Sequence, residues 1–179
     1  MLRKVAAVIE PYYPGLQELV QNMFDTMYKA EGVGLAAPQV GLSVRLFVVD
    51  GSALKENDPT LESFRKVFIN PVITNQSGQL WMWNEGCLSV HGIREDISRH
   101  SKIRIKYSDE NFEKYDEAFD GLKARIIQHE YDHLEGVLFP DRLNPFKKRI
   151  LKGKLLDITR GKIDTSYKMN FPAKKAVMF

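Results

Sequence analysis

The sequence predicts an α+β fold, and two observations carry this prediction. Short segments rich in β-branched and aromatic residues occupy the middle of the chain, after one early helix. A helical segment that carries His129 and His133 comes late, after these strands. A parallel α/β sheet would instead need strands and helices that alternate along the chain.

The first expected element is a helix near the amino terminus. Apolar residues recur there at helical spacing, at Leu16, Leu19, Val20, Met23 and Met27. This spacing places them on one face of a helix, which can pack against the core. We expect the helix to end near "AEGVG", residues 30–34.

Four segments are expected to form strands: residues 44–50, 66–73, 78–83 and 102–109. In the last of these, Ile103, Ile105 and Tyr107 alternate with polar residues, which is the pattern of a half-buried strand. Residues 51–63 are polar and show no periodicity, so a loop is expected there.

Two helices are expected in the last third of the chain. One runs from about Phe119 and ends at Gly136, because glycine commonly follows the last turn of a helix. The other covers residues 144–158, with Pro145 in its first turn, where proline is tolerated. Residues 162–171 are expected to form a last strand.

Length and composition favour one catalytic domain over residues 1–179, since a chain of this size can bury a full core. No apolar run approaches the roughly 20 residues needed to span a bilayer. The short apolar run near the start is followed by Glu10 and two prolines, which does not fit a secretory signal peptide. Cys87 is the single cysteine, so no internal disulfide can form. These features predict a cytoplasmic protein.

Charge is distributed unevenly along the chain. Residues 142–179, the expected C-terminal helix and tail, hold 11 Lys and Arg against two Asp, a net +9, whereas the rest of the chain carries −6. A solvated, lysine-rich helix is the simpler interpretation. The alternative is docking to a polyanion such as ribosomal RNA. Neither DNA nor a membrane is expected as a partner.

The stretch "QHEYDH" carries the strongest chemical signal. His129 and His133 lie four residues apart, so on a helix they can direct two imidazoles at one metal ion. Glu130 is rotated about 100° around the helix axis, which suits a general base rather than a ligand. A helix with ordinary surface histidines is the alternative that a third ligand would exclude.

A catalytic site of this kind needs a third protein ligand. One protease group takes this ligand from a histidine downstream, but Phe139 stands at that position here. Another group takes it from a later Glu, but no Glu follows Glu135. Asp157 could serve in principle, although it lies in the basic helix. Upstream, Cys87 in "EGCLSV" is the remaining candidate, because a thiolate binds Fe(II) or Zn(II) well. His91 is a rival ligand, and a merely buried Cys87 is the simpler alternative.

A third segment, "GVGLAAPQVG", runs from Gly32 to Gly41. Its early glycines allow the backbone to approach a ligand closely, or serve only a turn between helix and strand. A phosphate-binding loop is excluded, because no Lys-Ser/Thr pair follows at the required spacing.

Together, these three segments resemble the peptide deformylase family, which carries G-x-G-L-A-A-x-Q, E-G-C-L-S and Q-H-E-x-D-H in this order. Here they stand as "GVGLAAPQ" (Gly32–Gln39), "EGCLS" (Glu85–Ser89) and "QHEYDH" (Gln128–His133). The resemblance implies antiparallel β-sheets packed around the histidine helix. It implies removal of the N-formyl group from the initiator methionine of nascent chains, with one Fe(II) per chain that Zn, Ni or Co can replace.

The resemblance also implies roles for individual residues. The metal ligands would be Cys87, His129 and His133. Glu130 would be the general base, and Gln39 with the N–H of Leu88 would face the substrate carbonyl oxygen.

Substrate contacts are implied for Val33, Gly34, Trp83, Gly86, Leu122 and Ile126. The backbone near Gly34 would pair with an extended peptide, which is an instance of strand addition. Residues that would support the metal ligands from behind are Glu85, Arg99, Gln128 and Asp132.

Two other functions remain open. A zinc endopeptidase would share H-E-x-x-H, and an inactive metal-binding relative would keep the ligands without needing Glu130.

The chain departs from the family pattern at three places. His91 stands where the family usually has Pro, which predicts a looser loop. Arg125 stands where many members have an apolar residue, which would alter the rim of the pocket. Met1 directly precedes Leu2, where members usually have a short extended segment.

Overall fold

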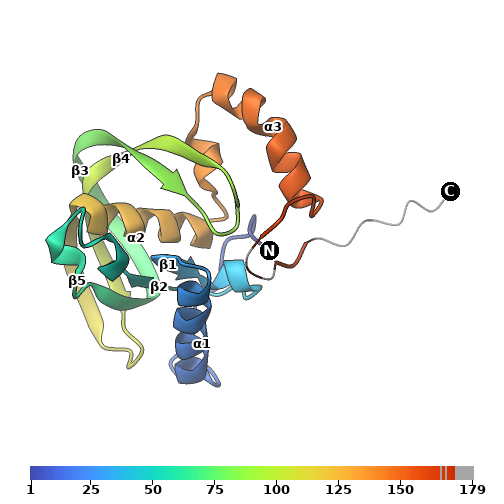
Figure 1. Ribbon diagram of the computed structural model, residues 1–179. Coiled ribbons are helices and arrows are strands. Elements are labelled where there is room, and N and C mark those ends of the chain that lie inside the picture. Colours follow the sequence, from blue (N-terminus) through green and yellow to red (C-terminus); the bar gives the residue numbers. More distant parts are fainter. Residues whose placement is uncertain (166, 168, 172–179) are drawn as a thin grey trace.

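The computed structural model describes residues 1–165, 167 and 169–171, which form an α+β fold (Figure 1). Within these residues, five strands form one antiparallel sheet whose spatial order follows the sequence. The strands are β1 (Gly34–Ala36), β2 (Leu46–Asp50), β3 (Arg65–Gly86), β4 (Arg94–Ser108) and β5 (Lys114–Asp120). The helices are α1 (Leu16–Lys29), α2 (Gly121–Leu134) and α3 (Pro145–Thr159). The predicted fold class is therefore confirmed.

Strand β2 is covered by helices on both of its faces. Successive side chains of a strand point to opposite faces. Leu46 and Val48 accordingly belong to the hydrophobic cluster that contains α1, whereas Phe47 and Val49 belong to the cluster that contains α2. The first part of the sheet is thus a layer between two helices, and it fixes α1 and α2 relative to each other.

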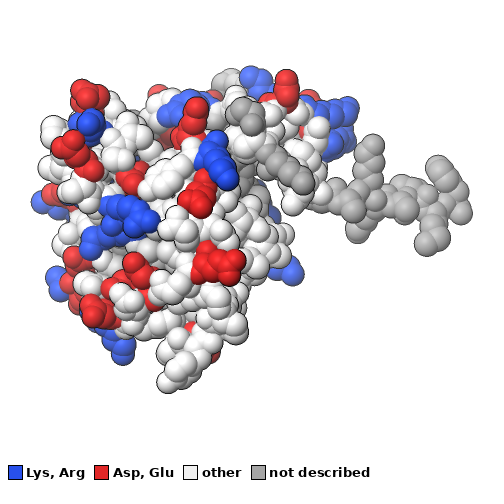
Figure 2. Space-filling model, turned by 60° about the horizontal axis from the view of Figure 1, so that its bottom comes forward, with Lys and Arg blue, Asp and Glu red and all other residues white. Residues whose placement is uncertain are grey.

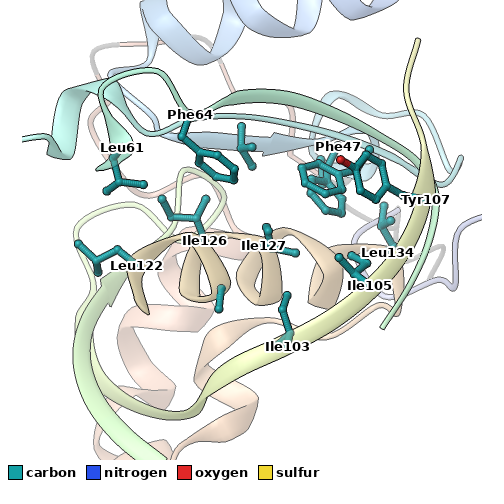
Figure 3. Packing of buried hydrophobic residues seen from close by; sticks show 14 of the residues in the cluster. Phe47, Leu61, Phe64, Ile103, Ile105, Tyr107, Leu122, Ile126, Ile127 and Leu134 are labelled. Carbon is teal, nitrogen blue, oxygen red and sulfur yellow. The ribbon is translucent and has the colours of Figure 1, made fainter. Parts of the chain in front are cut away.

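Helix α2 lies at the centre of the molecule, with strands on two of its sides (Figure 3). Ile126 and Ile127 of α2 pack among Phe47, Ile103 and Ile105, and these residues are almost completely buried. Because the helix is held by strands from both directions, the direction of every side chain along it is tightly fixed. The histidine helix therefore has a rigid frame.

Both terminal helices agree with the sequence prediction. Helix α1 buries Leu16, Val20, Met23 and Met27 on one face. Pro145 opens α3, and the side chain of Asn144 caps it by accepting a hydrogen bond of 2.9 Å from the backbone N–H of Lys147. Gly136 follows α2 with a φ of 70°, as expected of a residue that ends a helix.

Two predicted strands proved to be one. Residues 66–73 and 78–83 both belong to β3, which continues through the polar residues between them. The pairing with β4 shifts register between Ile69 and Val72, between Ile73 and Asn75, and between Ser77 and Leu80. These irregularities bend the strand without ending it, and the exposed polar stretch resembles a turn in the sequence.

The boundary at Phe119 was also wrong, because this residue lies in β5 and helix α2 begins two residues later, at Gly121. Strand β5 pairs with β4 and places Phe119 against the rings of Phe64 and Phe68. Residues 51–63 contain two short 3₁₀ helices within the expected loop. The described residues between 162 and 171 form no strand; residues 166 and 168 lie outside the described part of the chain.

Among the residues described, no helix combines the length and the apolar character needed to cross a lipid bilayer.

Candidate metal centre and catalytic cleft

Three potential ligand residues meet where β3 ends beside α2. Cys87 directly follows the last residue of β3, and His129 and His133 lie one turn apart on α2. One ligand atom of each residue lies within 4.8 Å of the other two. The Sγ of Cys87 is 3.3 Å from the Nε2 of His133. A thiolate and two imidazoles in this arrangement fit Fe(II) or Zn(II) and leave room for a further ligand.

The surroundings of Cys87 favour its thiolate, which is the form that binds a metal. Burial opposes ionisation of Cys87, but the neighbouring imidazoles of His133 and His129 hold the pKa of the thiol well below its ordinary value. The Nδ1 of His129 lies 3.0 Å from the Oε2 of Glu85. This contact directs the other ring nitrogen, Nε2, toward the thiol, as in metal sites whose histidines are oriented by a carboxylate.

Glu130 lies beside these ligands and is almost fully buried. Its Oε2 has no hydrogen-bond partner within the described residues. Burial raises the pKa of Glu130 to about 7, although the charges of His129 and His133 oppose this shift. A carboxyl group of this pKa can both accept and return a proton near neutral pH.

One glycine of the segment Gly32–Gly41, Gly34, makes room for this carboxylate. A Cβ added to Gly34 would lie 2.7 Å from the Cδ of Glu130, so only glycine leaves space for the side chain. The close approach that the sequence predicted is thus an approach to a catalytic candidate. The same segment brings Gln39 to the centre, 3.8 Å from the Sγ of Cys87 through its Nε2.

Gln39 is held at both ends of its amide. Its Oε1 accepts a hydrogen bond of 2.7 Å from the backbone N–H of Ala36, which fixes the orientation of the amide. Its Nε2 then faces Cys87 and donates to the Oγ of Ser89 at 3.1 Å. The side chain therefore presents an N–H donor at the metal centre.

A buried ionic network lies behind the ligands. Arg99 donates to both carboxylate oxygens of Glu85, at 2.7 and 2.9 Å, and to Asp132 at 2.8 Å. These three side chains are almost inaccessible to solvent. The pairing of Glu85 with Arg99 is as predicted. Burial opposes ionisation, but the bonds from His129 and Arg99 hold the pKa of Glu85 well below its usual range.

Gln128 and Asp132, also predicted to lie behind the ligands, anchor α2. The Nε2 of Gln128 donates to the carbonyl of His100 on β4 at 3.0 Å. Asp132 accepts from Arg99 and from Arg142, the latter at 2.6 Å through its Nε. Sequence reasoning did not identify Arg142.

Arg125 is among the residues that line the cleft, where the sequence predicted an effect on the pocket rim. Its side chain is only 3% exposed, and it donates to the Oε1 of Glu85 and to the carbonyls of Ile97 and Trp81. Arg125 lies one turn before His129 on the same helix face, and this four-residue spacing was the signal in the sequence.

A cleft of about 730 Å³ opens beside the ligands. Its walls include all six residues that were predicted to contact substrate: Val33, Gly34, Trp83, Gly86, Leu122 and Ile126. Strand β1 is an outer strand of the sheet, paired with β2 alone. The cleft therefore has an apolar pocket near the ligands and a strand edge along one wall.

The two other histidines do not join the metal centre. His91 contacts the hydroxyl of Tyr167, and His100 contacts the carbonyl of Gly78. The rival ligand His91 is therefore excluded, and Asp157 is outside the ligand group as well. Tyr167 lines the cleft, although nothing in the sequence pattern distinguished it.

The H-E-x-x-H helix, the cysteine and the buried glutamate place the chain in the class of metal-dependent hydrolases. The sequence profile described as polypeptide deformylase matches residues 1–149. The chain belongs to this family.

Individual relatives agree with this assignment. The peptide deformylase of Christiangramia forsetii is 52% identical, over 98% of this chain and 94% of its own. The peptide deformylase of Cytophaga hutchinsonii is 50% identical over 98% of this chain and 94% of its own. The crystal structure of the Thermus thermophilus enzyme superposes with a TM-score of 0.79 and 38% identity, covering 89% of this chain and 92% of that chain.

Proposed function

We propose that this chain removes the N-formyl group from the N-terminal methionine of newly synthesised polypeptides and releases formate. One observation carries the proposal: the ligand atoms of Cys87, His129 and His133 lie within 4.8 Å of one another, beside the buried carboxylate of Glu130. The peptide deformylases that resemble it over nearly their whole length support this reaction.

Cys87, His129 and His133 would hold one metal ion, and Fe(II) is our choice, with Zn, Ni or Co as substitutes. The mixed sulfur and nitrogen donor set suits these ions and not Mg or Ca. When bound, the ion supplies Lewis-acid chemistry and makes water acidic enough to react near neutral pH. Metal analysis of protein purified without air would identify the ion.

Glu130 would act as the acid and base of the reaction. Its carboxylate accepts a proton from the water that attacks the formyl carbon, and later gives the proton to the leaving amine. Its burial and its pKa of about 7 support both steps. Formate leaves when the bond between the formyl carbon and the amine nitrogen breaks.

Gln39 and Leu88 would stabilise the negative charge that develops on the formyl oxygen. The Gln39 amide is held with its Nε2 toward the centre, and Leu88 directly follows the ligand Cys87. Donors fixed before the reaction need no reorganisation as the charge appears.

The substrate would bind as an extra strand along the outer edge of β1, with Gly34 and its neighbours supplying backbone partners. The methionine side chain would enter the apolar pocket formed by Val33, Trp83, Leu122 and Ile126, and Gly86, which also lines the cleft, would contact the substrate. Four side chains would fix the position of α2 relative to the end of β3, so that the ligands stay together: Glu85, Arg99, Gln128 and Asp132.

The decisive experiment measures formate release from a short formyl-methionyl peptide by Fe(II)-loaded protein purified without air. We expect fast release by the parent protein and loss of release by Glu130→Ala with its metal retained. An acetyl-methionyl peptide is the control, since a site shaped for a formyl group excludes the extra methyl. Equal cleavage of the two peptides would contradict this specificity.

The same assay separates the alternatives. Cleavage of an unformylated peptide within its chain would favour a zinc endopeptidase. Full metal occupancy with no formate release would favour an inactive metal-binding relative.

Ribosome docking through the basic region of residues 142–179 is a further part of the proposal. On the face shown in Figure 2, acidic and basic side chains lie side by side, whereas this region is strongly basic in sequence. Lys148 and Lys152 are exposed and share one face of α3. Changing both to Glu should weaken cosedimentation with ribosomes, and unchanged binding would refute the docking.

We also propose that residues 1–179 form a single catalytic domain that works in the cytoplasm. One cooperative unfolding transition would support the first statement, and cell fractionation tests the second.

A further inference from the structure

The segment that follows α3 packs against the cysteine loop, which comprises residues 87–93 and joins β3 to β4. Ile163 packs against the hydrophobic cluster that contains Val90, Ile93 and Ile97, with Cys87 at its edge. Tyr167 also contacts the cysteine loop, at Leu88, and lines the catalytic cleft. Both residues lie beyond the part of the chain that the family profile covers, residues 1–149. A part of this chain outside the family profile therefore contributes to the cleft.

Tyr167 joins two residues of the cysteine loop by its hydroxyl. The Oη donates a hydrogen bond of 2.7 Å to the backbone carbonyl of Leu88. It also lies 3.2 Å from the Nδ1 of His91, and the two rings meet edge to face with centroids 5.6 Å apart. The hydroxyl has a single proton, which it gives to Leu88, so its contact with His91 requires an N–H at Nδ1.

The carbonyl that receives this bond belongs to a residue that matters for the reaction. Leu88 lies between the ligand Cys87 and Ser89, whose hydroxyl contacts the Gln39 amide. A hydrogen bond at the Leu88 carbonyl restricts rotation of the Leu88 backbone. It fixes the peptide plane that the Leu88 carbonyl shares with the Ser89 N–H. The preceding plane, which carries the Leu88 N–H proposed as donor to the substrate oxygen, is held by the bond of 2.9 Å from the Val90 N–H to the Cys87 carbonyl. The two bonds together hold the Leu88 backbone in one orientation.

We propose that Tyr167 is a positioning residue, whose hydroxyl holds the Leu88 backbone in the orientation that the reaction needs, while His91 orients the hydroxyl. The proline usual at position 91 would stiffen the loop from within. Here the loop is restrained from outside, through His91 and a tyrosine near the end of the chain. The inference rests on the proposed role of Leu88.

The test compares Tyr167→Phe with Tyr12→Phe in the full-length, metal-loaded protein. Tyr12 is 95% exposed, so losing its hydroxyl should change nothing. We expect Tyr167→Phe to lower kcat by about 10-fold, less than the 100- to 1,000-fold typical of losing an oxyanion donor outright. Metal content, KM and the unfolding midpoint should stay close to those of the parent. An unchanged or increased kcat would overturn the proposal.

A second measurement does not depend on activity. Loss of a hydrogen bond at a carbonyl moves its ¹³C resonance upfield, so Tyr167→Phe should shift the Leu88 carbonyl signal in Zn(II)-loaded protein. Tyr12→Phe should leave that signal in place. An unshifted Leu88 signal in Tyr167→Phe would show that the bond is absent in solution, and the proposal would fall.

The role of His91 is tested by a conservative exchange. Asn can place an N–H donor near the position of Nδ1, whereas Leu cannot. His91→Leu should therefore lower kcat as Tyr167→Phe does, and His91→Asn should restore most of it. Equal activity of the two variants would remove His91 from the proposal.

These outcomes are distinct from failure of the proposed function. If the parent protein releases no formate, the function itself is wrong. If the parent is active, Glu130→Ala is inactive and Tyr167→Phe equals the parent, only this inference is wrong.

Discussion

The guanidinium of Arg125 on α2 donates a hydrogen bond of 2.8 Å to the carboxylate of Glu85 at the end of β3. The same guanidinium lies 4.5 Å from the ring centroid of Trp81. Glu85 in turn contacts the proposed ligand His129. One cation thus joins the helix with both histidines to the strand that leads to Cys87, so the relative position of the three proposed ligands depends on it.

Replacing Arg125 by Met should destabilise the protein strongly. Glu85 would lose one of its buried partners, and the carbonyls of Trp81 and Ile97 would lose their donor. Breaking a buried ion pair from one side typically costs about 3–5 kcal/mol. Urea unfolding measures the loss, with Arg149→Met on the exposed side of α3 as the matched control. A loss no larger than that of the control would show that Arg99 alone suffices for Glu85.

Gly34→Ala should impair catalysis more than stability. The new methyl would lie 2.7 Å from the Cδ of Glu130, so the carboxylate must move away from the ligands. We expect kcat to fall by roughly 100-fold or more, within the range that a general base contributes.

Gly153→Ala is the matched control, because a Cβ there meets nothing within 4 Å. It should keep full activity and slightly stabilise α3, since Ala is the better helix former. If Gly34→Ala kept the parent kcat, Glu130 could not be acting from its observed position.

The candidate metal centre could be predicted from the sequence because its signals are local. The four-residue spacing of His129 and His133 becomes a shared helix face by geometry alone. Cys87 was reached by eliminating downstream ligands and by its resemblance to a family motif. The α+β class followed from the order of elements, which needs no knowledge of their contacts.

Other features depend on contacts between residues distant in sequence. The bond between Arg125 and Glu85 spans 40 residues, and that between Tyr167 and Leu88 spans 79. No periodicity encodes such a pairing. The extent of β3 was missed for a related reason: its polar middle is stabilised by pairing with β4, which outweighs local propensity.

Gln39→Glu separates the two functions of this amide. The substitution keeps an oxygen that can accept from the N–H of Ala36, but it removes the Nε2 donor that faces Cys87. We expect kcat to fall by about 100- to 1,000-fold, as for other lost oxyanion donors, with little change in stability. Steady-state kinetics measures the loss, and Gln76→Glu on the exposed part of β3 is the control. A mere rise in KM would assign Gln39 to substrate binding.

Glu85→Gln should weaken metal binding. The contact of 3.0 Å between Glu85 and the Nδ1 of His129 orients the ring, and Gln would replace a full negative charge by a neutral amide. Loss of such a partner typically lowers metal affinity by 10- to 100-fold. Competition with a chromogenic chelator for Zn(II) measures the affinity directly, without reference to turnover.

The control for this measurement is Glu62→Gln, since the Glu62 side chain is 70% exposed and, within the described part of the chain, its ion-pair partner is the exposed Lys55 alone. Because Arg99 and Arg125 would lose part of their counter-charge, the unfolding free energy of Glu85→Gln should fall as well. The chelator titration is therefore made well below the unfolding midpoint of the variant. An affinity equal to that of the parent would show that packing of α2, rather than the carboxylate, orients His129.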